Sequence, residues 1–360
     1  MVDLRADVVV FGAGLAGTAT ALYLARAGVD VLVIESSAAA PDQGLGHVEL
    51  GVVEQPARTI AALGADQAAE LFAFTDNNKR LLEEDGLFER SGALWVSASV
   101  GEHADIERAL QLLPGMGIRA EFLDADAVAK RTGAPSLGQA LWLPDDGRLV
   151  PSASATLLTL ARDAGARFAL GTRAARADVE AELVVVAAGC DSGGIESGLA
   201  TAFTSVRDAA LLTGPASHIL PGNRRSGHGW TTWRDHPGGG VVVSGSRWAT
   251  PHLELGESDA SVIEPRIQRK LEDFAMRQLG ITEPAVVKRW AWTFAQTRDS
   301  LPIIGPMPGD SRTIAAVGFG PNPASFAFAA ARAVADGITG EGGRVPAFLA
   351  STRLVRWRTG

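Results

Sequence analysis

The sequence of 360 residues predicts an α/β fold in which two domains share the chain in alternation. Three observations lead to this prediction. The first 35 residues follow the pattern strand, helix, strand; residues 206–294 contain runs typical of paired antiparallel strands; and residues 295–360 return to alternating strands and helices. Because no flexible linker and no internal repeat separates these segments, we expect the domains to interleave.

Composition narrows the class of protein before any motif is considered. Hydrophobic residues make up 46% and charged residues 21% of the chain, which is typical of a globular protein and not of a disordered or fibrous one. The net charge is −8 and no basic stripe is present, so we expect no nucleic-acid partner. Apolar runs stop short of the ~18 residues of a membrane-spanning helix, and the N-terminus lacks the pattern of a signal peptide.

The cysteine content points to a reducing compartment. Cys190 is the only cysteine, which excludes an internal disulfide and a cysteine metal cluster. We expect this residue to be a small hydrophobe in the core. No spacing of His, Asp and Glu indicates a metal site, so none is predicted. These features together predict a cytoplasmic protein.

The opening segment is the most informative part of the chain. Val8–Phe11 is a short apolar run typical of a buried parallel strand, and the glycine motif Gly12-Ala13-Gly14-Leu15-Ala16-Gly17 follows it directly. A helical pattern then continues to Gly28, a residue suited to a helix end. A second buried strand, Val31–Ile34, ends at Glu35.

Each part of this unit has a physical role in binding a dinucleotide. Gly12 permits the tight turn, Gly14 lets the backbone approach a pyrophosphate, and Gly17 lets the helix pack close to the strand. The helix N-terminus offers free N–H groups to the phosphates. Glu35 would accept hydrogen bonds from ribose hydroxyls, and its charge would repel the 2′-phosphate of NADP. The unit therefore predicts a dinucleotide site, without choosing between FAD and NAD.

The rest of the chain is predicted as short strands and helices. Two helices are expected over 56–74 and 75–85. Trp230–Trp233 and Val241–Ser244 are predicted to pair across a long turn, with Thr232 and Trp233 on opposite faces, and Val286–Phe294 alternates as a further strand. Further helices are expected, in chain order, over 103–112, 124–132, 152–165, 262–279 and 325–338.

Four later segments resemble motifs of one family of flavoproteins. Leu183–Ser192 is similar to a flavoprotein strand that ends in Ala-Thr-Gly, with Ala188 in place of the threonine. Asp299–Pro306 is similar to the segment Asp-Gly-Leu-Pro-Ile-Ile-Gly, Gly318–Asn322 to a flavin-contacting turn, and Pro144–Pro151 to a segment with the pattern Pro-x-Asp-Gly. The set resembles the superfamily of D-amino-acid oxidase, glycine oxidase and sarcosine oxidase, over nearly the whole chain.

The resemblance implies a fold and a reaction. The implied fold is a Rossmann-type FAD-binding domain of discontinuous segments, expected at 1–75, 141–205 and 295–360, and an α+β substrate domain with a large, mostly antiparallel sheet, expected at 76–140 and 206–294. The implied reaction is oxidation of a C–N bond in an amine or amino-acid-like substrate, by hydride transfer to flavin N5, giving an imine. O₂ or another acceptor would reoxidise the flavin. The alternatives are a flavin monooxygenase and a flavin-binding protein without amine turnover.

The resemblance also selects the residues expected to contact FAD. His47 follows the second strand in a loop that relatives bring to the flavin, and three roles are open for it: a covalent link to FAD, a non-covalent contact to flavin or substrate, or a structural role. Asn322, between two prolines, is expected to be rigid and to reach the flavin or the substrate. Besides the glycine motif, the expected FAD contacts are Glu35, Ser36, Gly46, His47, Ala174, Ala188, Gly189, Gly305, Gly318, Phe319, Gly320 and Asn322.

The substrate-binding residues of the family are not matched one for one. Phe294 stands where amino-acid oxidases of this group carry the arginine that binds the substrate carboxylate, and Trp292 stands where sarcosine oxidases carry a flavin-linked cysteine. Because Phe294 cannot bind a carboxylate, Arg247 or Arg234 on neighbouring strands could take over the role of that arginine, or both could be solvated. Trp290, Trp292 and Phe294 alternate on one face, as a substrate-facing wall or as core. The predicted catalytic residues are His47, Arg247, Arg234, His228 and Trp292.

Overall fold

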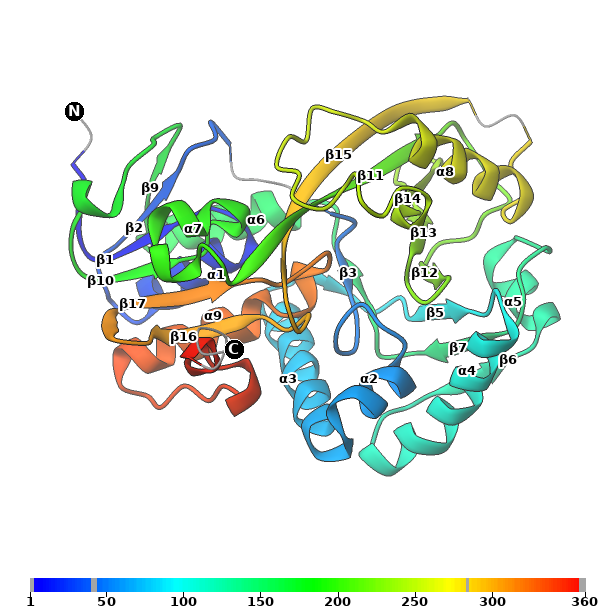
Figure 1. The fold of residues 1–360 in the computed structure, drawn as a ribbon, viewed down its shortest axis with the longest axis horizontal. Helices are drawn as coiled ribbons and strands as arrows, with labels where there is room; N and C mark the ends of the chain where they lie inside the picture. Colours follow the sequence, from blue (N-terminus) through cyan, green and yellow to red (C-terminus); the bar gives the residue numbers. More distant parts are fainter. Residues whose placement is uncertain (1–2, 40–43, 283–284, 356–360) are drawn as a thin grey trace.

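The computed structural model describes residues 3–39, 44–282 and 285–355. Two large sheets lie side by side, and the long strands β11 and β15 reach from the region of one sheet into the other (Figure 1). A third, three-stranded sheet is small. None of the helices in the described ranges combines the length and the apolarity needed to cross a membrane.

The six-stranded sheet contains the predicted strand–helix–strand unit. Its strand order is β16-β17-β10-β1-β2-β9, and all neighbours pair in parallel except β16 with β17. Helices α1 (Leu15–Arg26), α6 (Ala153–Asp163) and α9 (Ala327–Thr339) pack together against one face. The strands are β1 (Arg5–Phe11), β2 (Val31–Glu35), β9 (Arg167–Leu170), β10 (Glu180–Val186), β16 (Ile303–Met307) and β17 (Asp310–Val317).

The eight-stranded sheet has the order β15-β11-β14-β13-β12-β5-β7-β6 and is antiparallel except where β12 meets β5. The predicted hairpin is confirmed by the pairing of β13 with β14. Helix α8 (Pro265–Arg277) covers one face (Figure 1). The strands are β5 (Ala93–Val96), β6 (Glu121–Leu123), β7 (Ala140–Leu143), β11 (Phe203–Thr213), β12 (Asn223–Ser226), β13 (Thr231–Asp235), β14 (Val241–Gly245) and β15 (Val286–Thr297).

Alternation along the strands gives the eight-stranded sheet two different faces. Trp233 is fully buried on the face covered by α8, which confirms the predicted separation of Trp233 from Thr232. On the other face, Trp292 of β15 pairs with Asp208 of β11, and Thr232 of β13 pairs with both Ser244 of β14 and Arg225 of β12. We call these five residues the polar stripe: Arg225, Thr232, Ser244, Asp208 and Trp292. It crosses an otherwise apolar surface that includes Phe294 and Trp290.

The remaining helices and the small sheet complete the described part of the fold. The boundary between the first two predicted helices differs from the prediction: the helices are separated at Gly64, whose φ is +82°, and not at residue 74. Only a residue that tolerates a left-handed backbone ends a helix in this way, and the apolar pattern alone did not reveal it. These elements are α2 (Pro56–Leu63), α3 (Ala65–Glu84), α4 (Val100–Leu112), α5 (Ala125–Thr132), α7 (Ser192–Ile195), β3 (His47–Val48), β4 (Phe88–Glu89) and β8 (Gly147–Leu149).

Both large sheets draw on separated segments of the chain. The six-stranded sheet uses strands from residues 5–35, 167–186 and 303–317, and the eight-stranded sheet uses strands from 93–143 and 203–297. Short 3₁₀ turns connect several of them. The domain boundaries given above stay a prediction, because sheet membership alone does not divide the connecting helices. The 3₁₀ turns are η1 (Leu113–Met116), η2 (Arg176–Asp178), η3 (Gly189–Asp191), η4 (Ser197–Leu199), η5 (Arg247–Ala249), η6 (Pro323–Ser325), η7 (Ala347–Leu349) and η8 (Ser351–Arg353).

Candidate active site

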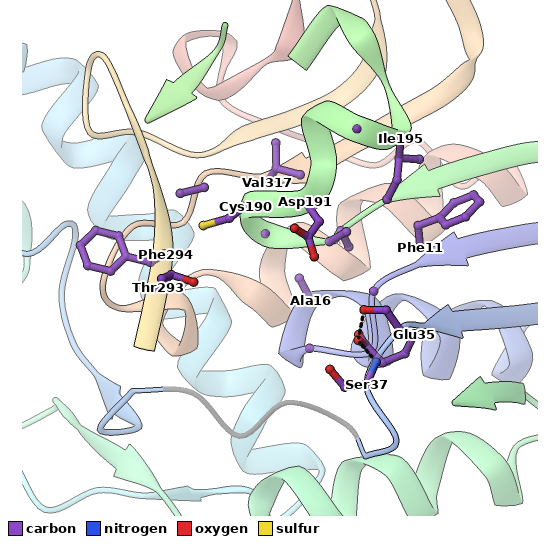
Figure 2. A pocket seen from close by; sticks show the side chains of 18 of the residues that line it. Phe11, Ala16, Glu35, Ser37, Cys190, Asp191, Ile195, Thr293, Phe294 and Val317 are labelled. Carbon is purple, nitrogen blue, oxygen red and sulfur yellow. Dashed lines mark hydrogen bonds between the residues drawn. The ribbon is translucent and has the colours of Figure 1, made fainter. Parts of the chain in front are cut away.

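A cavity of about 670 Å³ lies at the carboxyl ends of the parallel strands. Glu35 and Ser36, after β2, line one part of it, and Trp292 and Phe294, on β15, line another. Figure 2 shows Glu35 and Phe294 on opposite sides of this cavity. Ligands of parallel α/β sheets bind at this edge, and the volume is within the ~300–1,000 Å³ of small-molecule and cofactor sites.

The glycine motif shapes the turn between β1 and α1 as predicted. Gly12 has a φ of +102°, and a Cβ there would lie 2.5 Å from the carbonyl oxygen of Ala187. A Cβ on Gly17 would lie 1.9 Å from the carbonyl oxygen of Gly12, so this glycine permits the close helix–strand contact. Gly14 lines the cavity, and no atom lies within 4 Å of the place of its Cβ. No side chain caps α1, so its N–H groups can bind a phosphate.

Glu35 holds the turn and also faces the cavity. Its Oε2 accepts a hydrogen bond from the N–H of Ala13 at 2.9 Å. Its Oε1 accepts one from the N–H of Ser37 at 2.8 Å (Figure 2). Oε1 also accepts a hydrogen bond from the hydroxyl of Ser36 at 3.3 Å, and a carboxylate, with about four lone-pair sites, can still accept another bond after these three. The open face at Gly14, the uncapped helix and the acid at the end of β2 therefore fit the phosphates and the ribose of an adenine dinucleotide.

Most of the expected FAD contacts line this cavity, and some do not. Ala13, Gly17, Gly46 and Gly305 are not among the lining residues: Ala13 belongs to the turn, Gly17 lies in α1, Gly46 packs against Leu149, and Gly305 lies within β16. His47 and Asn322 line a second cavity described below. The expected contacts that line the large cavity are Gly12, Gly14, Leu15, Ala16, Glu35, Ser36, Ala174, Ala188, Gly189, Gly318, Phe319 and Gly320.

Cys190 corrects one expectation. The sequence predicts a core position, but the residue is half-buried and lines the large cavity (Figure 2). The reason is its place in the 3₁₀ turn η3, just beyond the last residue of β10, instead of within a strand. The hydroxyl of Ser205 donates a hydrogen bond to its sulfur at 3.3 Å, and burial raises the pKa of the thiol.

A second cavity of about 40 Å³ lies between the polar stripe and the loop after β2. All five stripe residues line it. The opposite side is formed by Leu45 and His47 and by Pro321 and Asn322. Trp292 and Pro321 line both cavities, so the small cavity adjoins the large one.

Three buried side chains, His47, Glu49 and Arg225, form a polar cluster beside the small cavity. His47 and Glu49 are each 2% exposed and Arg225 is 5% exposed. Nδ1 of His47 lies 3.0 Å from Oε1 of Glu49, and Nε of Arg225 donates a hydrogen bond to Oε2 of Glu49. Sequence analysis identified His47 but missed Glu49 and Arg225. They lie 176 residues apart in the chain, and only the sheet register brings them together.

Burial sets the charge of His47. Burial lowers the pKa of His47 to about 4, and this effect outweighs the opposing effect of Glu49. Burial alone would raise the pKa of Glu49, but Arg225 and His47 together lower it to about 2. At neutral pH the imidazole is therefore neutral beside a carboxylate, which favours the proton on Nδ1. Nε2 is then an acceptor; it is buried and makes no hydrogen bond to any residue in the described part of the chain.

Arg247 reaches the small cavity from the turn after β14. Ser246, with a φ of +58°, turns the chain so that Arg247 lies over the rings of Phe294, at 4.9 Å, and Trp230, at 5.3 Å. Its Nε is 3.7 Å from Oδ2 of Asp208. The guanidinium makes no side-chain hydrogen bond within the described ranges, so its N–H donors can bind a ligand.

Of the predicted catalytic residues, His47, Arg247 and Trp292 come together and two do not. Arg234 is half-buried, and its Nη1 donates a hydrogen bond to the carbonyl of Asp235 at 3.3 Å. His228 is half-buried, and its backbone N–H donates to Glu102 at 2.7 Å. Neither residue lines either cavity. Their catalytic roles stay predictions.

A second buried ion pair positions the loop that carries His47. Nζ of Lys79 lies 2.7 Å from Oδ1 of Asp146, and Oδ2 of Asp146 accepts a hydrogen bond from the N–H of Leu50 at 3.2 Å. The hydroxyl of Ser325 accepts a hydrogen bond from the N–H of Glu49 at 2.8 Å. The loop is therefore fixed from two sides before any ligand binds.

Comparison with known proteins agrees with this geometry. A family model described as DAO, FAD dependent oxidoreductase, matches residues 7–337. No curated protein matches the sequence. The chain is similar to an L-proline dehydrogenase from P. horikoshii, with a TM-score of 0.81, 18% identity and 99% of each chain covered. It is also similar to a glycine oxidase from Geobacillus kaustophilus (TM-score 0.75, 20% identity, 97% of this chain and 99% of that chain) and to an L-amino acid deaminase from Proteus myxofaciens in complex with anthranilate (0.74, 16%, 98% and 94%). At these identities the likeness concerns the fold.

Proposed function

Because the chain belongs to the DAO family of FAD-dependent oxidoreductases, we propose that it oxidises the C–N bond of an amine or amino-acid-like substrate to an imine. The observation that most supports the proposal is the small cavity beside Trp292, where the donors of Arg247 and the bare Nε2 of His47 make no hydrogen bonds to the described residues. These are groups that a carboxylate and an amine N–H would satisfy.

The residues have distinct roles in this proposal. The glycine motif, Glu35 and Gly318–Gly320 would hold FAD, which supplies the hydride acceptor at N5 when bound. Arg247, held by the ring of Phe294, would bind the substrate carboxylate from the turn after β14 instead of from the strand that relatives use. Nε2 of His47 would accept a hydrogen bond from the substrate nitrogen. Trp292, at the junction of the two cavities, would exclude water from the reacting carbon.

The names of the structural neighbours support the substrate class. A proline dehydrogenase, a glycine oxidase and an amino acid deaminase all carry names that refer to amino acids. Dehydrogenase and oxidase differ in the electron acceptor, and we propose no choice between O₂ and another acceptor.

An anaerobic titration of the purified holoprotein tests the function. Amines and amino acids are added one at a time, and loss of the visible absorbance of the oxidised flavin is followed. We expect one class of compound to reduce the flavin. Reduction by NADH with no reduction by any amine would favour a monooxygenase, and a flavin that no compound reduces would indicate a binding protein.

Arg247→Ala tests the carboxylate contact. Loss of a hydrogen bond to a charged group is worth about 2 kcal/mol, which raises KM for an anionic or zwitterionic substrate by at least ~30-fold. The matched control is Arg269→Ala, which removes an exposed arginine from α8 and should leave KM unchanged. An unchanged KM in Arg247→Ala would remove this residue from the site.

A further inference from the structure

Asp208 is a buried carboxylate that the roles assigned so far do not use. It is 5% exposed and lies on β11, on the face of the sheet that α8 does not cover, between Val206 and Ala210 of an apolar cluster. Its side chain accepts one hydrogen bond from the described residues, from the N–H of Ala209 at 2.9 Å. It lines the small cavity. An ionised carboxylate is costly to bury in such a place unless partners compensate its charge.

The neighbouring residue shows how a closed ion pair looks in the same strand. Nε of Arg207 donates to Oε2 of Glu254 at 2.8 Å, and Nη2 donates to Oε1 at 3.2 Å. Asp208 and Arg247 approach only to 3.7 Å and form no hydrogen bond, although both line one cavity. Burial raises the pKa of Asp208, and Arg247 opposes this effect only in part. Asp208 can therefore accept further hydrogen bonds, and Arg247 can donate further hydrogen bonds, to a ligand in this cavity.

The charges around the small cavity define the ligand that would complete it. The ionised Glu49 is compensated by Arg225, and His47 is neutral. In its ionised form Asp208 is the remaining negative group among the described residues that line this cavity, and Arg247 is the remaining positive group. A ligand that satisfies both carries one positive and one negative group a short distance apart, as the ammonium and carboxylate on one carbon atom are. A simple amine or a simple carboxylic acid would leave one buried charge without a partner.

We propose that Asp208 binds the substrate ammonium while Arg247 binds the carboxylate, so that the site selects a zwitterionic α-amino acid over simple amines and simple acids. This inference rests on the proposed function, which leaves the choice between amine and amino acid open. It assigns Asp208 as a specificity-determining residue that sequence analysis did not single out.

Three matched sets of probes test the inference on the holoprotein. The sets are alanine of either hand with propanoate and ethylamine, proline with cyclopentanecarboxylate and pyrrolidine, and phenylalanine with 3-phenylpropanoate and 2-phenylethylamine. Dissociation constants are measured anaerobically from the perturbation of the flavin spectrum, which also records any reduction. In the unmodified protein we expect one amino acid to bind at least ~10-fold more tightly than either of its truncated analogues.

Two variants then separate the two contacts. Asp208→Asn should weaken the amino acid and the amine by at least ~10-fold and leave the acid unchanged or tighter, because a repelling charge is gone. Arg247→Gln should weaken the amino acid and the acid and leave the amine unchanged. Asp126→Asn, on the exposed side of α5, is the control that should alter none of the three.

The outcomes distinguish the inference from the function on which it rests. An amine that binds as tightly as its amino acid, or an Asp208→Asn variant that weakens all three probes alike, overturns the inference even if the flavin is reduced. The predicted pattern without reduction of the flavin overturns the proposed oxidation and leaves the zwitterion site in place. If Asp208→Asn does not fold, the comparison of the three probes in the unmodified protein and in Asp208→Ser decides.

Discussion

Replacing His47 by glutamine should remove an acid-sensitive contribution to stability. Burial lowers the pKa of His47 from 6.5 to about 4. Above pH 6.5 the imidazole is neutral in both the native and the unfolded chain. Between pH 6.5 and pH 4 the imidazole is mostly protonated in the unfolded chain and mostly neutral in the native protein, so the free energy of unfolding falls as the pH falls.

The size of this effect follows from the shift. The lowered pKa corresponds to about 3 kcal/mol at pH 4, of which about 2 kcal/mol is lost between pH 7.5 and pH 5. Glu49 contributes little in that range, because its pKa is lowered to about 2 from an ordinary value of 4.5 and its own contribution is lost only below pH 4.5. The difference between the unmodified protein and the variant, measured at pH 7.5 and pH 5, therefore isolates the histidine.

The assay is urea unfolding of the holoprotein in excess FAD at the two pH values. We expect the free energy of unfolding to fall by about 2 kcal/mol more in the unmodified protein than in His47→Gln. His252→Gln, which removes an exposed histidine, is the matched control and should keep the full pH dependence. Imidazole ¹⁵N NMR shows directly which ring nitrogen carries the proton. Titration of His47 near pH 6.5, or a proton on Nε2 at neutral pH, would refute the reasoning.

Four further substitutions, and one double variant, test the cofactor turn and the loop anchor. Gly12→Ala should cost at least ~2 kcal/mol of stability, because the new Cβ would overlap a backbone oxygen at a residue with positive φ. Gly14→Ala should keep the stability of the FAD-free protein within ~1 kcal/mol and should bind FAD more weakly. Equal urea midpoints for the two variants would contradict the turn geometry. Glu35→Ala should raise the dissociation constant of FAD at least ~10-fold, as measured by flavin fluorescence, and an unchanged constant would argue against its contact. Lys79→Met should lower the free energy of unfolding by ~3–5 kcal/mol, because it leaves Asp146 buried without its partner, and the double variant with Asp146→Leu should recover most of this loss in the same urea assay; no recovery would mean that the pair is not coupled.

The cofactor half of the protein could be predicted from local sequence. Gly12, Gly14 and Glu35 lie within one strand–helix–strand unit, so short-range periodicity and the steric needs of a tight turn were enough to predict it. The alternation of Trp292 and Phe294 on β15 was equally predictable, because a strand repeats every two residues whatever it pairs with.

The small cavity depends on contacts that local sequence does not contain. Arg225 lies in a polar run, 223–226. This run is buried because it lies between β13 and β5, and its local hydropathy does not predict that burial. Asp208 could have been noticed in the sequence as a charged residue within an apolar strand. The position of its neighbour Arg247, however, depends on the turn at Ser246. Contacts between residues far apart in the chain depend on sheet register and on turn geometry. Both are properties of the folded chain as a whole, so only the assembled sheet could show which charges meet.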